Sequence, residues 1–407
     1  MSTQAVHIAG MRGQEAAARP GRSYVAELAG SWDEVRADWA GAGTPFQDPT
    51  WLGSWYDELS SCAGMRPLLV TVRDRASAEV AFHLPLILRR DGDGRTGLRV
   101  IEFADLGLTD YNAPLLGPAA PQGCSDIVRA VRAMRRVLPP ADLLRLAKMP
   151  ARIGPGQAQN PLAAAPGAVD CALNGNVVTI GADYDEWRRS LGRSYRKELE
   201  RSWRVFTRAE DASFARITDP AEASAIMATL ERQQGERMRL IGSAYILDDP
   251  DFSRFYQTVV RRGLEDGSVV VTALRAEGEV VASLVGLRRR EEYIMVRISQ
   301  AGSRWANCSP GRLVIERTLA MLHADGCRRF DFSIGNYDYK RRFDVVPLAL
   351  VDYVAPLGWR GLRAAARARL VGVLRKYPLV DARLRALQGK LRNRKAAVVR
   401  KDALEGE

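Results

Sequence analysis

The chain has 407 residues, of which 46% are apolar, and carries a formal charge of +12. This length and apolar content suit two domains with hydrophobic cores. No apolar run is long enough to cross a membrane, and residues 1–23 lack the continuous hydrophobic stretch of a signal peptide. We therefore expect a cytoplasmic protein with a disordered N-terminal extension at 1–23.

Cysteine and histidine usage excludes several kinds of site. The five cysteines are scattered without a C-x-x-C pair, which is typical of reduced thiols rather than of a disulfide framework. The three histidines form no cluster that would predict a zinc site or a histidine-based nucleophilic triad. We expect no metal.

The first half of the chain predicts one α/β unit. Strands are expected at 24–28, 66–73, 80–90, 98–103 and 142–148, and helices at 31–39, 44–59 and 124–138. Strand, helices, strand pair, strand, helix and strand follow one another over a length typical of a single domain. Residues 150–167, rich in Pro, Gly, Ala and Gln, are predicted to form a linker or an excursion from the fold.

The second half repeats this order. Strands are expected at 177–180, 214–217, 269–274, 280–288, 293–300, 329–334 and 348–354, with helices from Asp183 or Asp185 to Trp203 and at 220–238, 250–263 and 309–322. No residue-level repeat accompanies this order, so the duplication is a topological inference. We predict an N-terminal domain at 24–170, a C-terminal domain at 171–355 and a basic helical tail at 356–407.

One stretch of the second half predicts an anion site. In 293–300, Ile294, Val296 and Ile298 alternate with mostly polar residues, which indicates a half-buried strand. Ser309 is a natural N-cap for the next helix, and Pro310 suits its first position. Free N–H groups and the helix dipole attract anions there, and a glycine lets a ligand come close. The pattern suits a phosphorylated carrier such as coenzyme A, although many helices that bind nothing open in the same way.

The order of motifs resembles a known family. Ser309-Pro310-Gly311, then Phe330-Asp331-Phe332, Gly335 and Tyr339-Lys340 resemble the core signature of the CelD/BcsL branch of the GNAT acyltransferases, which is similar to the FemAB peptidyltransferases. The run from Pro45 to Leu52 and the run from Asp110 to Leu115 match as well, so the resemblance covers about 24 to 353. It implies two tandem GNAT-like domains with mixed sheets flanked by helices, an active site in the second, and acetyl-CoA or another acyl-CoA as co-substrate.

The strand and the helix start supply the predicted donor-binding residues, which are Ile298, Ser299, Gln300, Ser309, Pro310, Gly311, Arg312 and Leu313. In the usual GNAT enzymes the pyrophosphate is bound by a Gly-rich loop with a leading Gln or Arg. This chain has Ser-Pro-Gly at the corresponding position. The nature of the donor therefore stays open.

Three residues are the predicted catalytic groups. Asp331 lies between two phenylalanines, where burial would raise its pKa and suit a base, although a buried structural aspartate is an equal alternative. The resemblance to FemAB enzymes places Lys340 at the transfer site, with a surface lysine as the alternative. Tyr339 is a candidate proton donor, unless it only packs.

Acceptor-binding residues are predicted on three segments. The resemblance implies an Arg-rich helix before the active domain and a helix at the acceptor mouth, and a loop of the first half could line the cleft between domains. These residues are Arg193, Arg196, Lys197, Gln234, Arg237, Asp110, Tyr111 and Asn112. Alternatively, the Arg-rich face of this helix is only a solvated surface that binds no substrate.

These observations predict an N-acyltransferase that acts on an amine or hydroxyl of a small-molecule acceptor, such as a sugar or a cell-envelope or exopolysaccharide precursor. One alternative is a FemAB-like transferase that uses aminoacyl-tRNA, motivated by the arginine face and the basic tail. Another is a non-catalytic scaffold of a polysaccharide-synthesis complex. The tail predicts either peripheral contact with the inner face of a membrane or packing back onto the protein.

Overall fold

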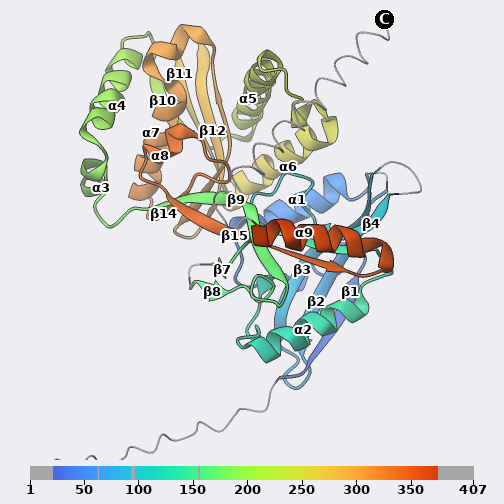
Figure 1. Ribbon diagram of the computed structural model, residues 1–407. Helices are drawn as coiled ribbons and strands as arrows, with labels where there is room; N and C mark the ends of the chain where they lie inside the picture. The colour runs from blue at the N-terminus through green and yellow to red at the C-terminus, as the bar shows by residue number, and fades with distance from the viewer. Residues whose placement is uncertain (1–21, 63, 93–96, 155, 375–407) are drawn as a thin grey trace, which may run out of the picture.

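A computed structural model describes residues 22–62, 64–92, 97–154 and 156–374. In these residues one sheet of thirteen strands runs through the molecule, in the order β1-β2-β3-β4-β6-β15-β9-β14-β13-β12-β11-β10, with β5 paired to β3 (Figure 1). The mixed α/β fold with helices on the sheet agrees with the predicted class. No described helix is long and apolar enough to cross a membrane.

The first half contains a meander followed by a parallel strand. Its strands are β1 (Tyr24–Ala29), β2 (Arg66–Asp74), β3 (Val80–Asp91), β4 (Leu98–Phe103), β5 (Leu115–Leu116) and β6 (Leu143–Pro150). Strands β1 to β4 pair antiparallel in succession, and β6 pairs parallel to β4. The helices are α1 (Pro49–Leu59) and α2 (Cys124–Val137), with short 3-10 turns η1 (Arg36–Asp38) and η2 (Pro45–Gln47).

The second half has the same pairing pattern. Its strands are β10 (Ser213–Ile217), β11 (Val269–Ala276), β12 (Glu279–Arg289), β13 (Glu292–Gln300) and β14 (Arg329–Asp331). Strands β10 to β13 pair antiparallel in succession, and β14 pairs parallel to β13. The larger helices are α3 (Tyr184–Ser190), α4 (Arg193–Phe206), α5 (Pro220–Leu240), α6 (Pro250–Asp266) and α7 (Pro310–Ala324), and the short elements are η4 (Ile246–Asp248), η5 (Ser303–Cys308) and α8 (Asp338–Arg341).

Two long strands join the halves by crossing between them. β9 (Ala168–Thr179) follows the first half in the chain but pairs with β14, whereas β15 (Val346–Pro356) follows the second half but pairs with β6. β9 and β15 also pair with each other, at the junction seen in Figure 1. The strand expected at 348–354 is β15, which pairs with β6 of the first half as well as with β9. The domain limits remain a prediction.

The halves also share a hydrophobic core. α1 packs on α6, and the Trp51 and Phe255 rings meet edge to face with centroids 4.9 Å apart. The predicted linker holds the short pair β7 (Arg152–Ile153) and β8 (Ala158–Gln159). After η6 (Trp359–Gly361), α9 (Leu362–Leu374) packs on β15 and β9, and the rest of the predicted tail lies outside the described residues.

Two local predictions need correction. The helix expected to continue to Trp203 is two helices, because the chain is extended at Leu191 and Gly192 between α3 and α4. Asp183 caps α3, accepting hydrogen bonds from two backbone N–H groups. The second correction concerns β13, where the register against β12 shifts by one residue at Val285 and Gly286.

That β-bulge changes which way the side chains of β13 point. A bulge inserts one residue and so reverses the alternation beyond it. Ile294 and Val296 contact the core under α5 and α6, but Ile298 packs with the opposite cluster, beside α7. The expectation that all three share one face was therefore wrong for Ile298.

Candidate active site

A cavity opens where β13 and β14 separate. The two strands pair only from Glu292 to Ile294 of β13, so in the described chain no ladder joins β14 to the rest of that strand. The cavity has a volume of about 410 Å³ and lies between β13, α5, α7 and the segment around α8. Its lining residues are Gln233, Gln234, Arg237, Met238, Ile241, Ile298, Ser299, Gln300, Gly311, Ile315, Tyr337 and Tyr339.

The lining brings together residues from several sequence predictions. Three predicted donor residues of β13 and Gly311 of α7 meet Gln234 and Arg237, which were expected at the acceptor mouth, and Tyr339 completes the group. The only charged side chain in this lining is Arg237, which is exposed and pairs with no carboxylate of the described chain. The cavity can therefore attract an anion, but its own walls hold no carboxylate that could act as a base.

The Gln234 side chain forms part of the cavity wall, and its amide is already hydrogen-bonded within the chain. Its Nε2 donates a 2.7 Å hydrogen bond to the carbonyl of Ile298, on β13. Its Oε1 accepts from the Tyr245 hydroxyl at 2.9 Å and from the Arg297 guanidinium at 3.2 Å. The bulge directs Arg297 to this side, where its guanidinium lies 4.5 Å from the centre of the Tyr256 ring. Sequence reasoning missed Arg297, whose only signal was a charge within an apolar strand.

The N-terminus of α7 differs from the expected cap. Ser309 has φ 49°, in the left-handed region, and its side chain makes no capping bond. Its hydroxyl instead accepts a 2.6 Å hydrogen bond from Arg312. The Ser309 carbonyl accepts from the backbone N–H groups of Arg312 and Leu313, and the Gly311 N–H donates to Gln300 Oε1 at 3.1 Å. The first turn is thus already hydrogen-bonded, and an anion would have to displace Gln300 to reach Gly311.

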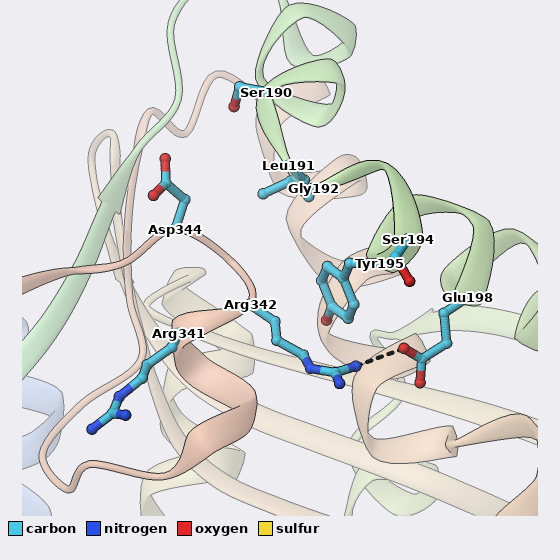
Figure 2. A pocket seen from close by; sticks show the side chains of 9 residues that line it. All are labelled: Ser190, Leu191, Gly192, Ser194, Tyr195, Glu198, Arg341, Arg342 and Asp344. Carbon is cyan, nitrogen blue, oxygen red and sulfur yellow. Dashed lines mark hydrogen bonds and ion pairs between the residues drawn. The ribbon is translucent and has the colours of Figure 1, made fainter.

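A second hollow lies between the start of α4 and the end of α8. It has a volume of about 380 Å³ and is lined by residues of α3, α4 and α8 and the turn beyond, shown in Figure 2. Glu198 accepts 2.6 Å bonds from both Arg312 and Arg342, and these two guanidinium groups lower the pKa of its carboxyl against the opposing effect of burial. The Arg342 guanidinium lies 5.5 Å from the centre of the Tyr195 ring, and the buried Tyr195 hydroxyl has no hydrogen-bond partner among the described residues.

The residues of the predicted arginine face do not line this hollow. Arg193 and Lys197 are exposed on α4, Arg196 is half-buried, and none of the three lines either of the two cavities. Their substrate role remains a prediction. The α4 residues that do line the hollow are Ser194, Tyr195 and Glu198.

Asp331 lies at the junction of the halves and not in the main cavity. It is fully buried, and its Oδ1 accepts a 2.7 Å bond from the Tyr111 hydroxyl and a 2.6 Å bond from the Ser333 N–H. Burial raises the pKa of this carboxyl to about 7, against the lowering effect of these hydrogen bonds. These contacts match the structural alternative, and the base assignment remains a prediction.

Lys340 is buried rather than exposed, so the alternative of a surface lysine was wrong. Its Nζ donates to the carbonyls of Ser333 and Ile334, at 3.1 and 2.8 Å. Burial lowers the pKa of this ammonium to about 8, although Asp331 and Asp110 counteract the effect. Lys340 therefore holds the turn that leads to Tyr337 and Tyr339, and it does not line the main cavity.

The loop from Asp110 to Asn112 reaches across to the second half. The Asp110 carboxylate accepts a hydrogen bond from the Ser333 hydroxyl, and Tyr111 bonds Asp331. Asn112 is buried and donates to Asp105 at 2.9 Å. Asp110 and Tyr111 thus connect the halves, Asn112 bonds within the first half, and none of the three lines the main cavity.

Tyr339 is half-buried in the cavity wall and stacks on Tyr337, with ring centroids 6.1 Å apart. Burial raises the pKa of its hydroxyl to about 12, so it is protonated at neutral pH. A protonated phenol at a cavity wall can donate a proton. No group of three or more potential metal ligands occurs in the described residues.

Comparisons with known proteins agree with this architecture. Residues 193–341 match the family model described as an acetyltransferase (GNAT) domain. A search of curated protein sequences finds no match. The solved structure of FemX is similar, with a TM-score of 0.53 and 12% identity over 81% of this chain and 97% of FemX. That likeness shows the fold.

Two further structures give lower scores. L-PGS from Bacillus licheniformis aligns with a TM-score of 0.44 and 10% identity, over 80% of this chain and 97% of that one. A tandem GNAT protein from the clavulanic acid biosynthesis pathway aligns with a TM-score of 0.42 and 12% identity, over 82% and 99%. Residues 193–341 therefore carry a GNAT-type acetyltransferase domain, which supports an acyltransferase, within a chain whose fold is similar to that of FemX.

Proposed function

We propose that the cavity between β13, α5 and α7 binds an acyl-CoA, with acetyl-CoA as the first candidate, and transfers its acyl group to an amine. The observation that carries this proposal is that one cavity joins the unpaired edge of β13 to the N-terminus of α7. Strand edges offer backbone hydrogen bonds to an extended amide-containing arm, and helix N-termini favour phosphate.

The residues present fit such a donor at two places. Beyond Ile294, no described strand pairs with this edge of β13, so the amides of a pantetheine arm could pair there once Gln234 releases the Ile298 carbonyl. At α7, a Cβ on residue 311 would lie 2.6 Å from Gln300 Oε1, so glycine lets a ligand come close once the flexible Gln300 side chain moves. Arg312 belongs to this first turn, and its guanidinium pairs with Glu198 at 2.6 Å, so it would have to leave that carboxylate to contact a phosphate.

The transfer step needs few groups. The acceptor nitrogen attacks the thioester carbonyl carbon, the new C–N bond forms, and the C–S bond breaks. The proton released by the nitrogen goes to solvent, because the cavity lining has no carboxylate. Tyr339 protonates the departing thiolate and regains its proton from solvent. The acceptor therefore has to arrive as a neutral amine.

We further propose that the acceptor belongs to the sugar or cell-envelope precursors, as the resemblance to the CelD/BcsL branch implies, with a role in exopolysaccharide synthesis. The polar lining of the second hollow is consistent with a polar acceptor. Its lining includes the hydroxyl of Ser194, the orphan hydroxyl of Tyr195 and the side chain of Arg341. Amino sugars are the first acceptors to assay with acetyl-CoA.

Calorimetric titration with acetyl-CoA and coenzyme A tests the donor. We expect saturable binding to the natural protein and loss of binding in Gly311→Leu, whose side chain would fill the cavity. Gly181→Leu is the matched control, because Gly181 has open space around its Cβ position and lies outside the lining. A folded protein that binds neither molecule would contradict the proposal.

A second candidate donor is an aminoacyl-tRNA, as the FemAB resemblance implies. The first turn of α7 favours aminoacyl-tRNA over coenzyme A as the donor. The N–H groups of Gly311, Arg312 and Leu313 already donate hydrogen bonds within the chain, so they are not free to bind a pyrophosphate. Binding of charged tRNA that weakens steeply with salt, in a protein that does not bind coenzyme A, would support this donor. No binding of charged tRNA at low salt would remove it.

A further inference from the structure

The outer side of α9 exposes large apolar side chains. Trp359, in the turn before the helix, is 82% exposed, and Leu362 and Leu370 of the helix are 56% and 60% exposed. The inner side is already packed, because Ala365 is buried against Val354 of β15. The exposed leucines are eight residues apart and so lie on one side of the helix. This second apolar stripe has no role in the packing of the described chain.

The same segment is strongly cationic. From Tyr353 to Val380 the sequence holds six arginines and lysines and no acidic residue. Arg363 and Arg367 are exposed, one turn apart on α9, and neither is paired with a carboxylate of the described chain. The exposed stripe therefore combines leucines, a tryptophan and unpaired positive charges, and what covers it has to be both apolar and anionic.

Charge argues against two possible occupants. Residues 375–407 hold ten basic and four acidic residues, so this segment would bring more positive charge to a positive helix. A second copy of α9 would likewise bring its own Arg363 and Arg367 to the same interface, because symmetric dimers pair the same surface of both subunits. Nucleic acid would satisfy the arginines but offer nothing to the aliphatic leucines.

We propose that η6 and α9 dock on the surface of an anionic phospholipid bilayer. Trp359, Leu362 and Leu370 enter the boundary between headgroups and acyl chains, and Arg363 and Arg367 lie at the phosphates. Interfacial helices bind by this pairing of apolar area with electrostatic attraction. The docking does not depend on the chemistry of the cavity, but it would hold an enzyme of envelope precursors next to the membrane.

Vesicle sedimentation with the full chain tests the proposal. We expect binding to vesicles that contain phosphatidylglycerol, little binding to pure phosphatidylcholine, and release at high salt. Replacing Arg363 or Arg367 by glutamine should weaken binding about fivefold each, from roughly 1 kcal/mol per cation near the surface. The triple variant Trp359→Ala, Leu362→Ser and Leu370→Ser should weaken it more than tenfold.

The control is Leu173→Ser, which removes an exposed leucine of β9 and should leave vesicle binding unchanged. Equal thermal midpoints show that each variant is folded. Unchanged vesicle binding in the triple variant would overturn the proposal. So would RNA binding that the arginine variants lose and the apolar variants keep, or a lipid-free dimer that the triple variant dissociates.

Discussion

The Tyr111 hydroxyl donates a 2.7 Å hydrogen bond to Asp331, a residue 220 positions further along the chain. Both side chains are buried where the two halves meet. Burial raises the pKa of the Asp331 carboxyl from 3.8 to about 7. The carboxylate is therefore costly in the folded state, and its hydrogen bonds offset only part of that cost.

Asp331→Asn should stabilise the protein near neutral pH. The folded-state pKa lies above the unfolded one, so the natural protein loses stability as pH rises from about 4 to about 7. The amide keeps an acceptor for Tyr111 and Ser333 and cannot ionise, so we expect a gain of the order of 1–3 kcal/mol at pH 7. Urea unfolding across this range measures it. If acyl transfer disappears while stability rises, Asp331 is the base after all.

Tyr111→Phe should destabilise the protein by about 1–3 kcal/mol, because it removes a donor from a buried carboxylate. It should also raise the pKa of Asp331 further, since the Tyr111 hydrogen bond lowers it. Tyr24→Phe is the matched control: that hydroxyl is buried without a partner among the described residues. Equal losses of stability in the two variants would show that the bond across the halves contributes nothing.

Lys340→Met tests a positioning role. The folded-state pKa of about 8 lies below the ordinary 10.5, so the natural protein should gain stability as pH rises between these values. The variant should lack this gain. It also loses the two bonds to the carbonyls of the turn before Tyr339, so we expect a higher KM for the donor. A large fall in kcat with an unchanged KM would instead place Lys340 at the transfer site.

Gln300→Ala should tighten coenzyme A binding about two- to tenfold, because one competing hydrogen bond of about 0.5–1.5 kcal/mol is removed from the Gly311 N–H. Calorimetry measures the change. The matched control is Gln257→Ala on α6, which removes a bond to Ser224 outside the cavity lining. Weaker binding would mean that Gln300 contacts the donor directly.

Tyr339→Phe should lower kcat about a hundredfold or more and leave the affinity for coenzyme A nearly unchanged, because the hydroxyl acts only when the thiolate departs. Tyr337→Phe is the control, since Tyr337 lines the same cavity but is 60% exposed. Single-turnover rates with a fixed amine acceptor measure both. Equal rates in the natural protein and Tyr339→Phe would assign the proton to solvent.

Local patterns predicted the elements that build the cavity. The alternation at 293–300 predicted β13, and Ser309-Pro310 predicted the start of α7, because both signals lie within a few residues. The bulge that redirects Arg297 lies where β13 pairs with Val285 and Gly286 of another strand, β12. Glu198 of α4 forms ion pairs with Arg312 and Arg342, which both lie more than a hundred residues further along the chain, so no local pattern predicts these contacts.

The role of Asp331 also depends on a contact that local sequence patterns do not predict. Its flanking phenylalanines predicted burial correctly, but burial suits both a base and a structural acceptor. Its partner Tyr111 lies in the other half, and no local pattern pairs the two. Sequence reasoning placed the residues on their elements, and tertiary pairing decided which of them face the cavity.

The crossing of β9 and β15 has a consequence for synthesis on the ribosome. The first half pairs β6 with β15, which is the last strand of the sheet to be made, while the second half needs β9, which is made before the rest of it. Domains usually fold in the order in which they are translated. Here the nascent first half has an open strand edge until Pro356 has left the exit tunnel, and a chaperone that shields that edge would improve the yield of folded protein.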